Sequence, residues 1–429
     1  MLKVNTIDAT LSRNSILRLL IHFIDARQSH SIACGLIAKH RSIRHLYVSK
    51  GQEAVENCEI AETSLGFDSL SRLELAMEVS LFFNLHTSGI DDYLLVRHKI
   101  ADWIDLIQSH FKKVGVAASL TFQTSGSLGQ SKPCLHTVRS LSDEISALLE
   151  GPLAKCSATG RIISLVPPQH IYGFLFTCLL PSRTNRNVID VSLSSMLQTF
   201  EVARPGDVII ATPYIWDLLA RSGLRLRKDV FGVTSAGPAT PTTWSVQEKI
   251  GVHKLIEIYG STETAGIGYR LDQDARFSLF AHLSQRSGSL RKIGTPDETL
   301  ALQDHLTWHT ENTFSLNQRR DDAVQVAGVN ISPKYVAEVL CSADVVADAI
   351  VRWDGAHLKA FIVPIDLSQD HTEIIDQVHA CTVNNLAAPA RPNCITIGKH
   401  LPRNAMGKLT DWNHVPSTPT QGINVQPPG

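Results

Sequence analysis

The stretch from about residue 115 to residue 318 constrains the fold most, because short apolar segments alternate there with helical segments and with turns that contain glycine or proline. Such alternation predicts a layered α/β sheet in which functional loops follow the strand ends. The strand candidates are residues 118–122, 162–166, 207–211, 230–234 and 255–259.

The rest of the chain has a different texture, and the sequence therefore divides into four parts. Residues 1–112 are expected to form a helical domain, and residues 113–320 the large α/β domain. A small, mobile α+β domain is expected over 321–415. The tail, 416–429, is rich in Pro, Thr, Gly and Gln, a composition that predicts disorder.

Local signals support this division. Ser332 followed by Pro333 is typical of a helix start, because serine caps the helix and proline fits its first turn. Asp354-Gly355 between two apolar runs predicts a hairpin turn. In the first part, apolar residues at helical spacing predict helices over 11–27, 68–83 and 93–108.

Composition excludes several classes of protein. The 429 residues carry a formal net charge of −1, so no overall field attracts nucleic acid. The most apolar stretch, residues 171–180, is about half of the roughly 20 residues that a membrane-spanning helix needs. The eight cysteines show no CxxC pair, which is typical of reduced thiols in a cytoplasmic protein. A cytoplasmic enzyme without a membrane span or a nucleic-acid partner is expected.

A loop rich in small residues follows the first strand candidate. Its backbone N–H groups, its hydroxyls and one lysine can surround a phosphate. The spacing is not that of a kinase or GTPase P-loop, because Ser131 precedes the lysine and Pro133 follows it. The alternative is a flexible surface loop. The candidate phosphate contacts are Thr124, Ser125, Gly126, Ser127, Gly129 and Lys132.

This loop resembles TSGSTGxPK, the phosphate loop of the adenylate-forming superfamily, which includes acyl- and aryl-CoA ligases, luciferases and peptide-synthetase adenylation domains. Three further matches follow in the family's order: Tyr-Gly-Ser-Thr-Glu from Tyr259, Arg-Arg-Asp-Asp from Arg319, and Pro-Arg-Asn-Ala-Met-Gly-Lys-Leu around Lys408. The resemblance spans roughly residues 118–412. It implies a large α/β domain, shortened on its N-terminal side, and a small C-terminal domain.

The resemblance assigns ATP contacts within the second motif. Tyr259 would stack beside adenine, with Gly260 next to it, and Thr262 would bond phosphate. Glu263 would help to hold Mg²⁺, which suits a hard carboxylate oxygen and bridges phosphate oxygens. Gly237, in the run Ser-Ala-Gly-Pro, resembles the turn that lies against adenine. For the motif that begins at Tyr259, the structural alternative is a helix start capped by Ser or Thr.

Further residues follow from the later motifs. Arg319 and Asp304 would contact the ribose, although the residues around Asp304 depart from the family's TGD. Asp321 would be the hinge between the large and small domains. Lys408 would neutralise the charge that builds on the carboxylate and the α-phosphate as they react.

The nature of the acid is indicated by a run that resembles the PxxHxYG stretch of aryl- and acyl-CoA ligases. His170 would border the acyl pocket, and Tyr172 and Gly173 would belong to it. Apolar neighbours suggest a hydrophobic slot. An aromatic acid such as a hydroxybenzoate or cinnamate fits, and so does a short or medium fatty acid. His170 as a structural histidine is the alternative.

The N-terminal part carries a second resemblance. Leu-Gly-Phe-Asp-Ser-Leu, residues 65–70, resembles the LGxDSL run of acyl carrier proteins, in which Ser69 would bear 4'-phosphopantetheine. In that helix Leu70, Leu73, Met77 and Leu81 lie near one face. The alternative is that Asp68 and Ser69 only cap a helix.

Together these features predict a ligase that makes an acyl-adenylate from a carboxylic acid and MgATP and then transfers the acyl group to a phosphopantetheine thiol. The thiol can belong to coenzyme A, to a separate carrier protein or to the chain's own Ser69. The alternative is a non-catalytic carrier or scaffold protein with a decayed adenylation fold. The presence of Lys132, Glu263, Asp321 and Lys408 argues against decay.

Overall fold

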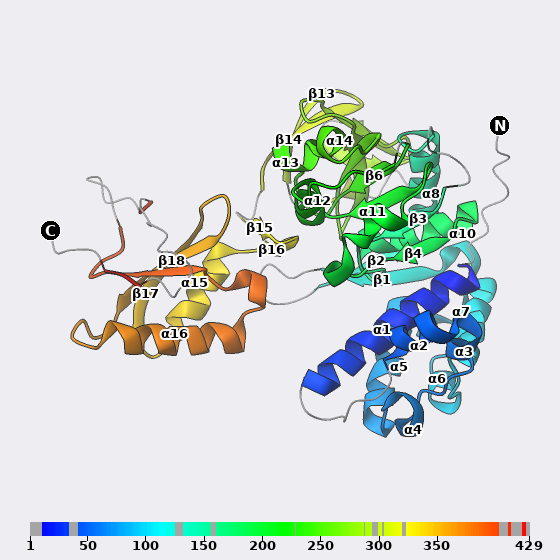
Figure 1. Cartoon of the computed structure of the whole chain (residues 1–429), viewed down its shortest axis with the longest axis horizontal. Coiled ribbons are helices and arrows are strands. Elements are labelled where there is room, and N and C mark those ends of the chain that lie inside the picture. The colour runs from blue at the N-terminus through cyan, green and yellow to red at the C-terminus, as the bar shows by residue number, and fades with distance from the viewer. Residues whose placement is uncertain are drawn as a thin grey trace. The chain divides into compact units, whose positions relative to one another are not determined.

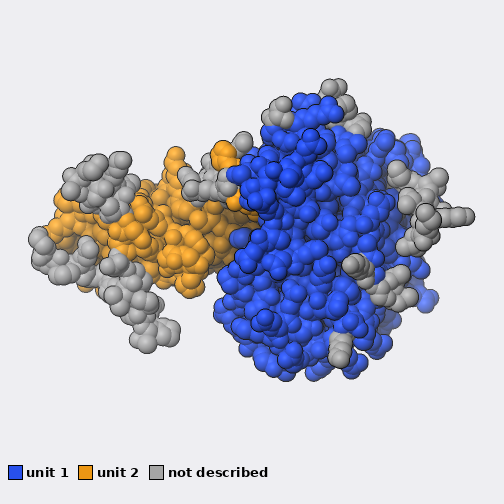
Figure 2. All heavy atoms as spheres, turned by 90° about the horizontal axis from the view of Figure 1, so that it is seen from above, with its two compact units in different colours: residues 1–124, 133–302, 306–315 blue, residues 125–132, 303–305, 316–429 orange. Residues whose placement is uncertain are grey.

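The computed structural model describes residues 11–33, 42–124, 132–154, 156, 160–227, 229–286, 288–293, 299–302, 304–319, 323–402, 411–412 and 423–425 (Figure 1). The chain forms two compact units (Figure 2). Unit 1 comprises residues 1–124, 133–302 and 306–315, and unit 2 comprises residues 125–132, 303–305 and 316–429.

The largest sheet has the strand order β13-β14-β9-β8-β7-β6-β5-β3-β4. Its β4, β3, β5, β6 and β7 are parallel, and β8, β9 and β14 continue antiparallel. Buried apolar runs such as β5 are typical of parallel strands covered on both faces. The predicted α/β fold is confirmed. The strands are β3 Ile162–Ser164, β4 Val188–Asp190, β5 Val208–Ala211, β6 Phe231–Thr234, β7 Lys254–Ser261, β8 Ala265–Arg270, β9 Phe277–Leu279, β13 Asp304–Thr310 and β14 Thr313–Arg319.

Smaller elements complete unit 1. Strands β1 (Ser119–Gln123) and β2 (Pro133–Thr137) pair antiparallel on either side of residues 124–132, the predicted phosphate loop. Strands β10 (Leu283–Arg286), β11 (Ser289–Lys292) and β12 (Thr299–Leu300) form another sheet. The helices after the loop are α8 Val138–Glu150, α9 Ile171–Phe174, the π-helix η3 Leu175–Leu179, α10 Leu180–Thr184, α11 Gln198–Val202, α12 Pro213–Ala220, α13 Pro241–Trp244 and α14 Val246–Lys249.

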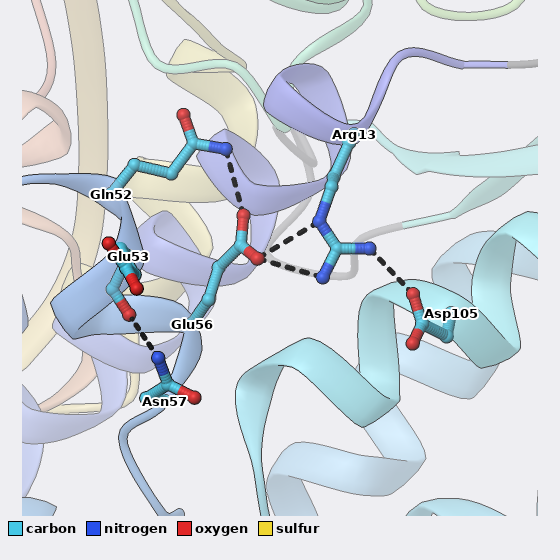
Figure 3. Close-up of polar contacts among 6 residues, drawn as sticks. All are labelled: Arg13, Gln52, Glu53, Glu56, Asn57 and Asp105. Atoms are coloured by element: carbon cyan, nitrogen blue, oxygen red, sulfur yellow. Dashed lines mark hydrogen bonds and ion pairs between the residues drawn. The ribbon is translucent and has the colours of Figure 1, made fainter.

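The N-terminal part is helical, as predicted (Figure 1). Arg13 joins three of its helices, because the guanidinium donates to Glu56 Oε2 at 2.8 and 2.9 Å and to Asp105 Oδ1 at 2.6 Å (Figure 3). These contacts connect α1 with α3 and α7. The helices are α1 Arg13–Ala33, α2 Ile43–Lys50, α3 Gln52–Glu56, α4 Glu62–Leu65, α5 Ser69–Phe83, α6 Tyr93–Val96 and α7 Ile100–Val114.

These helices share one hydrophobic core with the α/β part of unit 1. Phe82 on α5 lies edge-on to Phe122 on β1 and to Phe174 on α9, with ring centroids 5.4 and 6.2 Å apart. Ser15 on α1 donates to Cys178 O in η3 at 2.8 Å. The boundary that the sequence places at 112/113 therefore falls inside a continuous core.

Helix α5 presents its apolar stripe to solvent. Leu70, Leu73, Met77 and Leu81 are 65, 38, 56 and 57% exposed. The buried row on the other side includes Phe82 and Phe83, whose rings fill the shared core. Because α5 is apolar around most of its circumference, the spacing of the leucines alone does not tell which side faces inward.

Unit 2 contains the small α+β domain. Ser332 Oγ accepts from Tyr335 N at 3.3 Å and Pro333 begins α15, as predicted. The hairpin of β17 and β18 turns at Asp354, whose carboxylate accepts from His357 N at 2.7 Å. Of the predicted tail, residues 423–425 are described, as strand β20. The elements are β15 Val324–Val326, β16 Val329–Ile331, α15 Pro333–Cys341, β17 Val346–Trp353, β18 Leu358–Pro364, α16 His371–Asn385, β19 Cys394–Ile397 and β20 Ile423–Val425.

Across the described ranges of both units, the helices lack the combination of length and apolar character that crossing a membrane requires.

Candidate functional site

The strand that leaves the phosphate loop is bonded to the turn that carries the predicted metal ligand. His136 on β2 donates from Nε2 to Thr262 O at 2.7 Å. Cys134 lies two residues earlier on the same strand face. Burial and the nearby Glu263 carboxylate raise the pKa of the Cys134 thiol. Thr262 and Glu263 therefore lie close to the exit of the loop, within unit 1.

The turn between β7 and β8 is closed by its own side chains. Thr264 Oγ1 donates to Ala265 O at 2.9 Å and accepts from Ser261 N at 3.2 Å. Thr262 is half-buried and Glu263 is exposed. A carboxylate in this position fits Mg²⁺, which binds proteins through one or two carboxylates while phosphates supply further oxygens. The described residues contain no group of three or more His, Cys, Asp or Glu that could form an all-protein metal site.

A buried glutamate that the sequence analysis did not identify binds the strand that follows this turn, β8. Glu144, on α8, is 1% exposed and accepts from Gly266 N at 3.0 Å. Burial raises the pKa of Glu144 to about 7. Its position in the helical pattern resembles that of any polar helix residue, so only the tertiary contact identifies it.

The predicted adenine turn is anchored on β7. Ser235 Oγ donates to Ile258 O at 2.9 Å, and Ala239 N donates to Glu257 Oε1 at 2.8 Å. Buried Glu257 also accepts from Arg270 Nε at 2.5 Å. These bonds hold the run that contains Gly237 between β6 and α13.

Tyr259 follows two residues after Glu257 on β7. Its half-buried ring packs against Phe277 and Phe314, with centroids 5.8 and 5.7 Å away. Gly260 separates it from the Ser261–Thr264 turn. Strand β7 thus contains Tyr259, the predicted adenine contact, and leads directly into the turn that contains Thr262 and Glu263.

The predicted ribose residues lie at one end of a hairpin. Asp304 begins β13 and Arg319 ends β14, and these two strands are neighbours joined through Glu311 and Asn312. The first residue of one arm and the last residue of the other therefore meet at the open end of the hairpin. Asp304 is half-buried, and for Arg319 the backbone alone is described.

The predicted acyl-pocket residues have different surroundings. His170 is exposed at the N-cap position of α9. Tyr172 is buried, and its hydroxyl lies 2.9 Å from Val233 O and 3.1 Å from Ala211 O, which ties α9 to the ends of β6 and β5. Gly173 allows a close approach of the chain, because a Cβ there would lie 1.9 Å from Pro167 O.

Helix α1 reaches the neighbourhood of His170. Burial, together with positive charge on Arg44, His170 and Arg18, lowers the pKa of His22 to about 4. Arg18 also pairs with Asp190 at the end of β4. His22 on α1 therefore lies within electrostatic range of the predicted acyl-pocket residue His170.

The remaining predicted residues have these places. Thr124 and Lys132 flank the loop, and Ser69 is exposed as the first residue of α5. Asp68 caps that helix by accepting from Ser71 N at 2.8 Å. Ser125, Gly126, Ser127, Gly129, Asp321 and Lys408 lie outside the described residues.

Comparisons with known proteins identify the family of the chain. Residues 117–296 match the family model described as "AMP-binding enzyme". The chain is 37% identical over 405 residues to a 4-coumarate–CoA ligase of Cereibacter sphaeroides, covering 94% of this chain and 98% of that protein. It is 36% identical over 357 residues to a 4-coumarate–CoA ligase of Rhodobacter capsulatus, covering 82% of this chain and 92% of that protein.

Solved structures show the same fold at lower identity. An o-succinylbenzoate CoA synthetase from Bacillus subtilis superposes with a TM-score of 0.54 at 18% identity, over 91% of each chain. A malonyl-CoA ligase superposes with a TM-score of 0.52 at 16% identity, over 67% of this chain and 72% of that one.

Proposed function

The chain belongs to the AMP-binding family of adenylate-forming acid–thiol ligases, and from this membership we propose that it converts a hydroxycinnamate-type aryl acid into its coenzyme A thioester. ATP-dependent activation of a carboxylic acid is the family's reaction. The aryl acid and the coenzyme A acceptor are supported by the names of the two curated relatives. The bond from His136 to Thr262 O carries the proposal, because it holds the loop exit against the Thr262–Glu263 turn.

In the first step a carboxylate oxygen of the acid attacks the α-phosphorus of ATP, and pyrophosphate leaves. Backbone N–H groups and hydroxyls of residues 124–131, with Lys132, bind the departing phosphates. Glu263 would hold Mg²⁺, which would offset the charge of these phosphates. Lys408 stabilises the negative charge that develops between the acid and the phosphorus.

In the second step the thiol attacks the acyl carbon, the acyl–phosphate bond breaks, and AMP leaves. We assign the hinge for the change between the two steps to Asp321, at the start of the small domain. Rotation about a few hinge residues is a common way to exchange catalytic groups. Tyr259, Gly237, Asp304 and Arg319 bind the nucleoside in both steps.

The test is acid-dependent exchange of pyrophosphate into ATP, followed by thioester formation with coenzyme A. The panel contains 4-coumarate, cinnamate, 4-hydroxybenzoate and medium-chain fatty acids. We expect exchange to be fastest with the hydroxycinnamate and the Lys408→Ala variant to lose exchange while still converting synthetic acyl-adenylate to thioester. ATP binding without exchange for any acid would favour the non-catalytic alternative.

Ser69 supports a second candidate acceptor. Its hydroxyl is exposed at the start of α5, where the helix N-terminus favours an attached phosphate. Incubation with a phosphopantetheinyl transferase and coenzyme A, followed by intact mass measurement, tests this role with Ser69→Ala as the control. An unchanged mass would leave coenzyme A or a separate carrier as the acceptor. A cytoplasmic location remains a prediction from the cysteine pattern.

A further inference from the structure

A buried lysine lies inside the small domain, apart from the residues assigned to ATP. Lys359, on β18, is 5% exposed. Its Nζ donates to Trp412 O at 2.8 Å and pairs with Asp411 Oδ1 at 2.7 Å. A buried ammonium is costly unless it is paired and hydrogen-bonded, and these partners satisfy it.

Trp412 makes two further contacts with the same face of β18. The Lys359 Nζ lies 4.8 Å from the centroid of the Trp412 ring, within range of a cation–π contact. Phe361, two residues along β18, meets that ring edge-on with centroids 5.6 Å apart. Trp412 is itself only 5% exposed.

Phe361 also contacts the chain just beyond β19. A Cβ on Gly398 would lie 2.3 Å from the Phe361 ring, so the backbone there runs directly against it. The opposite face of β18, with Ala360 and Ile362, belongs to the hydrophobic core under α15 and α16. The Lys359–Phe361 face therefore holds the chain both before and after residues 403–410.

We propose that Lys359 is a positioning residue for Lys408, because it fixes Asp411 and Trp412 at the C-terminal end of the segment that carries the catalytic lysine. This inference rests on the proposed function, which assigns Lys408 to the adenylation step. Lys359 itself touches neither the acid nor the nucleotide in this scheme. It acts through the length of chain that separates it from Lys408.

Chain length gives the size of the constraint. Trp412 is the fourth residue after Lys408, and a chain of this length can span at most about 14 Å. Loss of the Lys359 contacts therefore removes this restriction from the C-terminal side of Lys408.

The test compares the two half-reactions in Lys359→Met, which keeps the length of the side chain but loses its charge. We expect acid-dependent pyrophosphate exchange to fall by about tenfold or more, since a misplacement of about 1 Å can cost 10²-fold. Thioester formation from synthetic acyl-adenylate and coenzyme A should stay within about twofold of the parent, because Lys408 acts in the other step. Trp412→Leu should show the same pattern.

Two controls separate positioning from loss of structure. Lys334→Met removes an exposed lysine of the same domain and should change neither half-reaction. Hydrogen exchange at the amides of Asp411 and Trp412 should be faster in Lys359→Met, with the amides of β18 unchanged. In a Lys408→Ala background, Lys359→Met should lower exchange no further.

The outcomes of these experiments test the positioning role of Lys359 separately from the proposed function on which it rests. If the parent protein shows no exchange with any acid, the proposed function is wrong. If the parent is active and Lys359→Met keeps full exchange, or loses both half-reactions equally, the positioning role alone is overturned.

Discussion

Replacing Glu144 by glutamine should stabilise the protein in alkaline solution and not in acid. The carboxyl is 1% exposed, accepts one hydrogen bond from Gly266 N, and has an Oε1 atom without a hydrogen-bond partner among the described residues. Burial raises the pKa of Glu144 from its ordinary value of 4.5 to about 7. The folded state therefore holds a proton that the unfolded chain releases above pH 4.5.

This proton determines whether the free energy of unfolding rises or falls with pH. Between pH 4.5 and 7 the folded state binds more protons than the unfolded state, so the free energy of unfolding falls as the pH rises. Above pH 7 the loss is complete and amounts to ~3 kcal/mol. Most of that loss, about 2–3 kcal/mol, falls between pH 5 and 8.5. Glutamine does not titrate, so the Glu144→Gln variant does not lose this free energy of unfolding as the pH rises.

The assay is urea unfolding of the parent and of Glu144→Gln at pH 5, 7 and 8.5. The difference between their unfolding free energies should shift by about 2–3 kcal/mol in favour of the variant across this range. Glu150→Gln, at the exposed end of the same helix, is the matched control and should show no such shift. A Glu144→Gln difference that is constant with pH would refute the argument.

Three further changes test other contacts. Phe82→Ala should lower the free energy of unfolding by about 3–5 kcal/mol, and unit 1 should still unfold in one transition, because the ring lies in a core shared by α1, α5, β1 and α9; a separate early transition of the N-terminal helices would contradict this. His136→Leu should raise KM for MgATP in the exchange assay by about fivefold, since one hydrogen bond worth ~1 kcal/mol holds the loop exit to the Thr262 turn. An unchanged KM would count against that role. Tyr172→Phe should cost about 1–2 kcal/mol in urea unfolding and leave acid selectivity unchanged, because the hydroxyl bonds backbone carbonyls; altered selectivity would place the hydroxyl in the pocket.

Local sequence signals predicted local structure well. The strand predicted over 207–211 is β5, Val208–Ala211, and the one over 230–234 is β6, Phe231–Thr234. The Ser332 cap and the Asp354 turn are also confirmed. In each case the cause lies within a few residues, since capping and apolar periodicity depend on near neighbours alone.

Contacts between distant parts of the chain were not predictable in this way. Glu144 and Gly266 are 122 residues apart, and His136 and Thr262 are 126 apart. Nothing in the spacing around Glu144 distinguishes a residue that faces the core from one on the surface of an amphipathic helix. Only the packing of α8 against the sheet decides that.

The carrier resemblance at residues 65–75 shows how a motif and a structural role can overlap. Phe67 and Leu75 are buried, and Asp68 caps α5, so most of the run has a task in folding. The helix it starts buries Phe82 and Phe83 in the core shared with the sheet, whereas a carrier that delivers its arm to other sites needs freedom to move. Ser69 is the position where the two interpretations separate, because its exposed hydroxyl packs into no core. Folding alone therefore does not require a serine there. A Ser69→Ala variant with unaltered stability and unaltered thioester formation would leave helix capping as the sufficient explanation of the run.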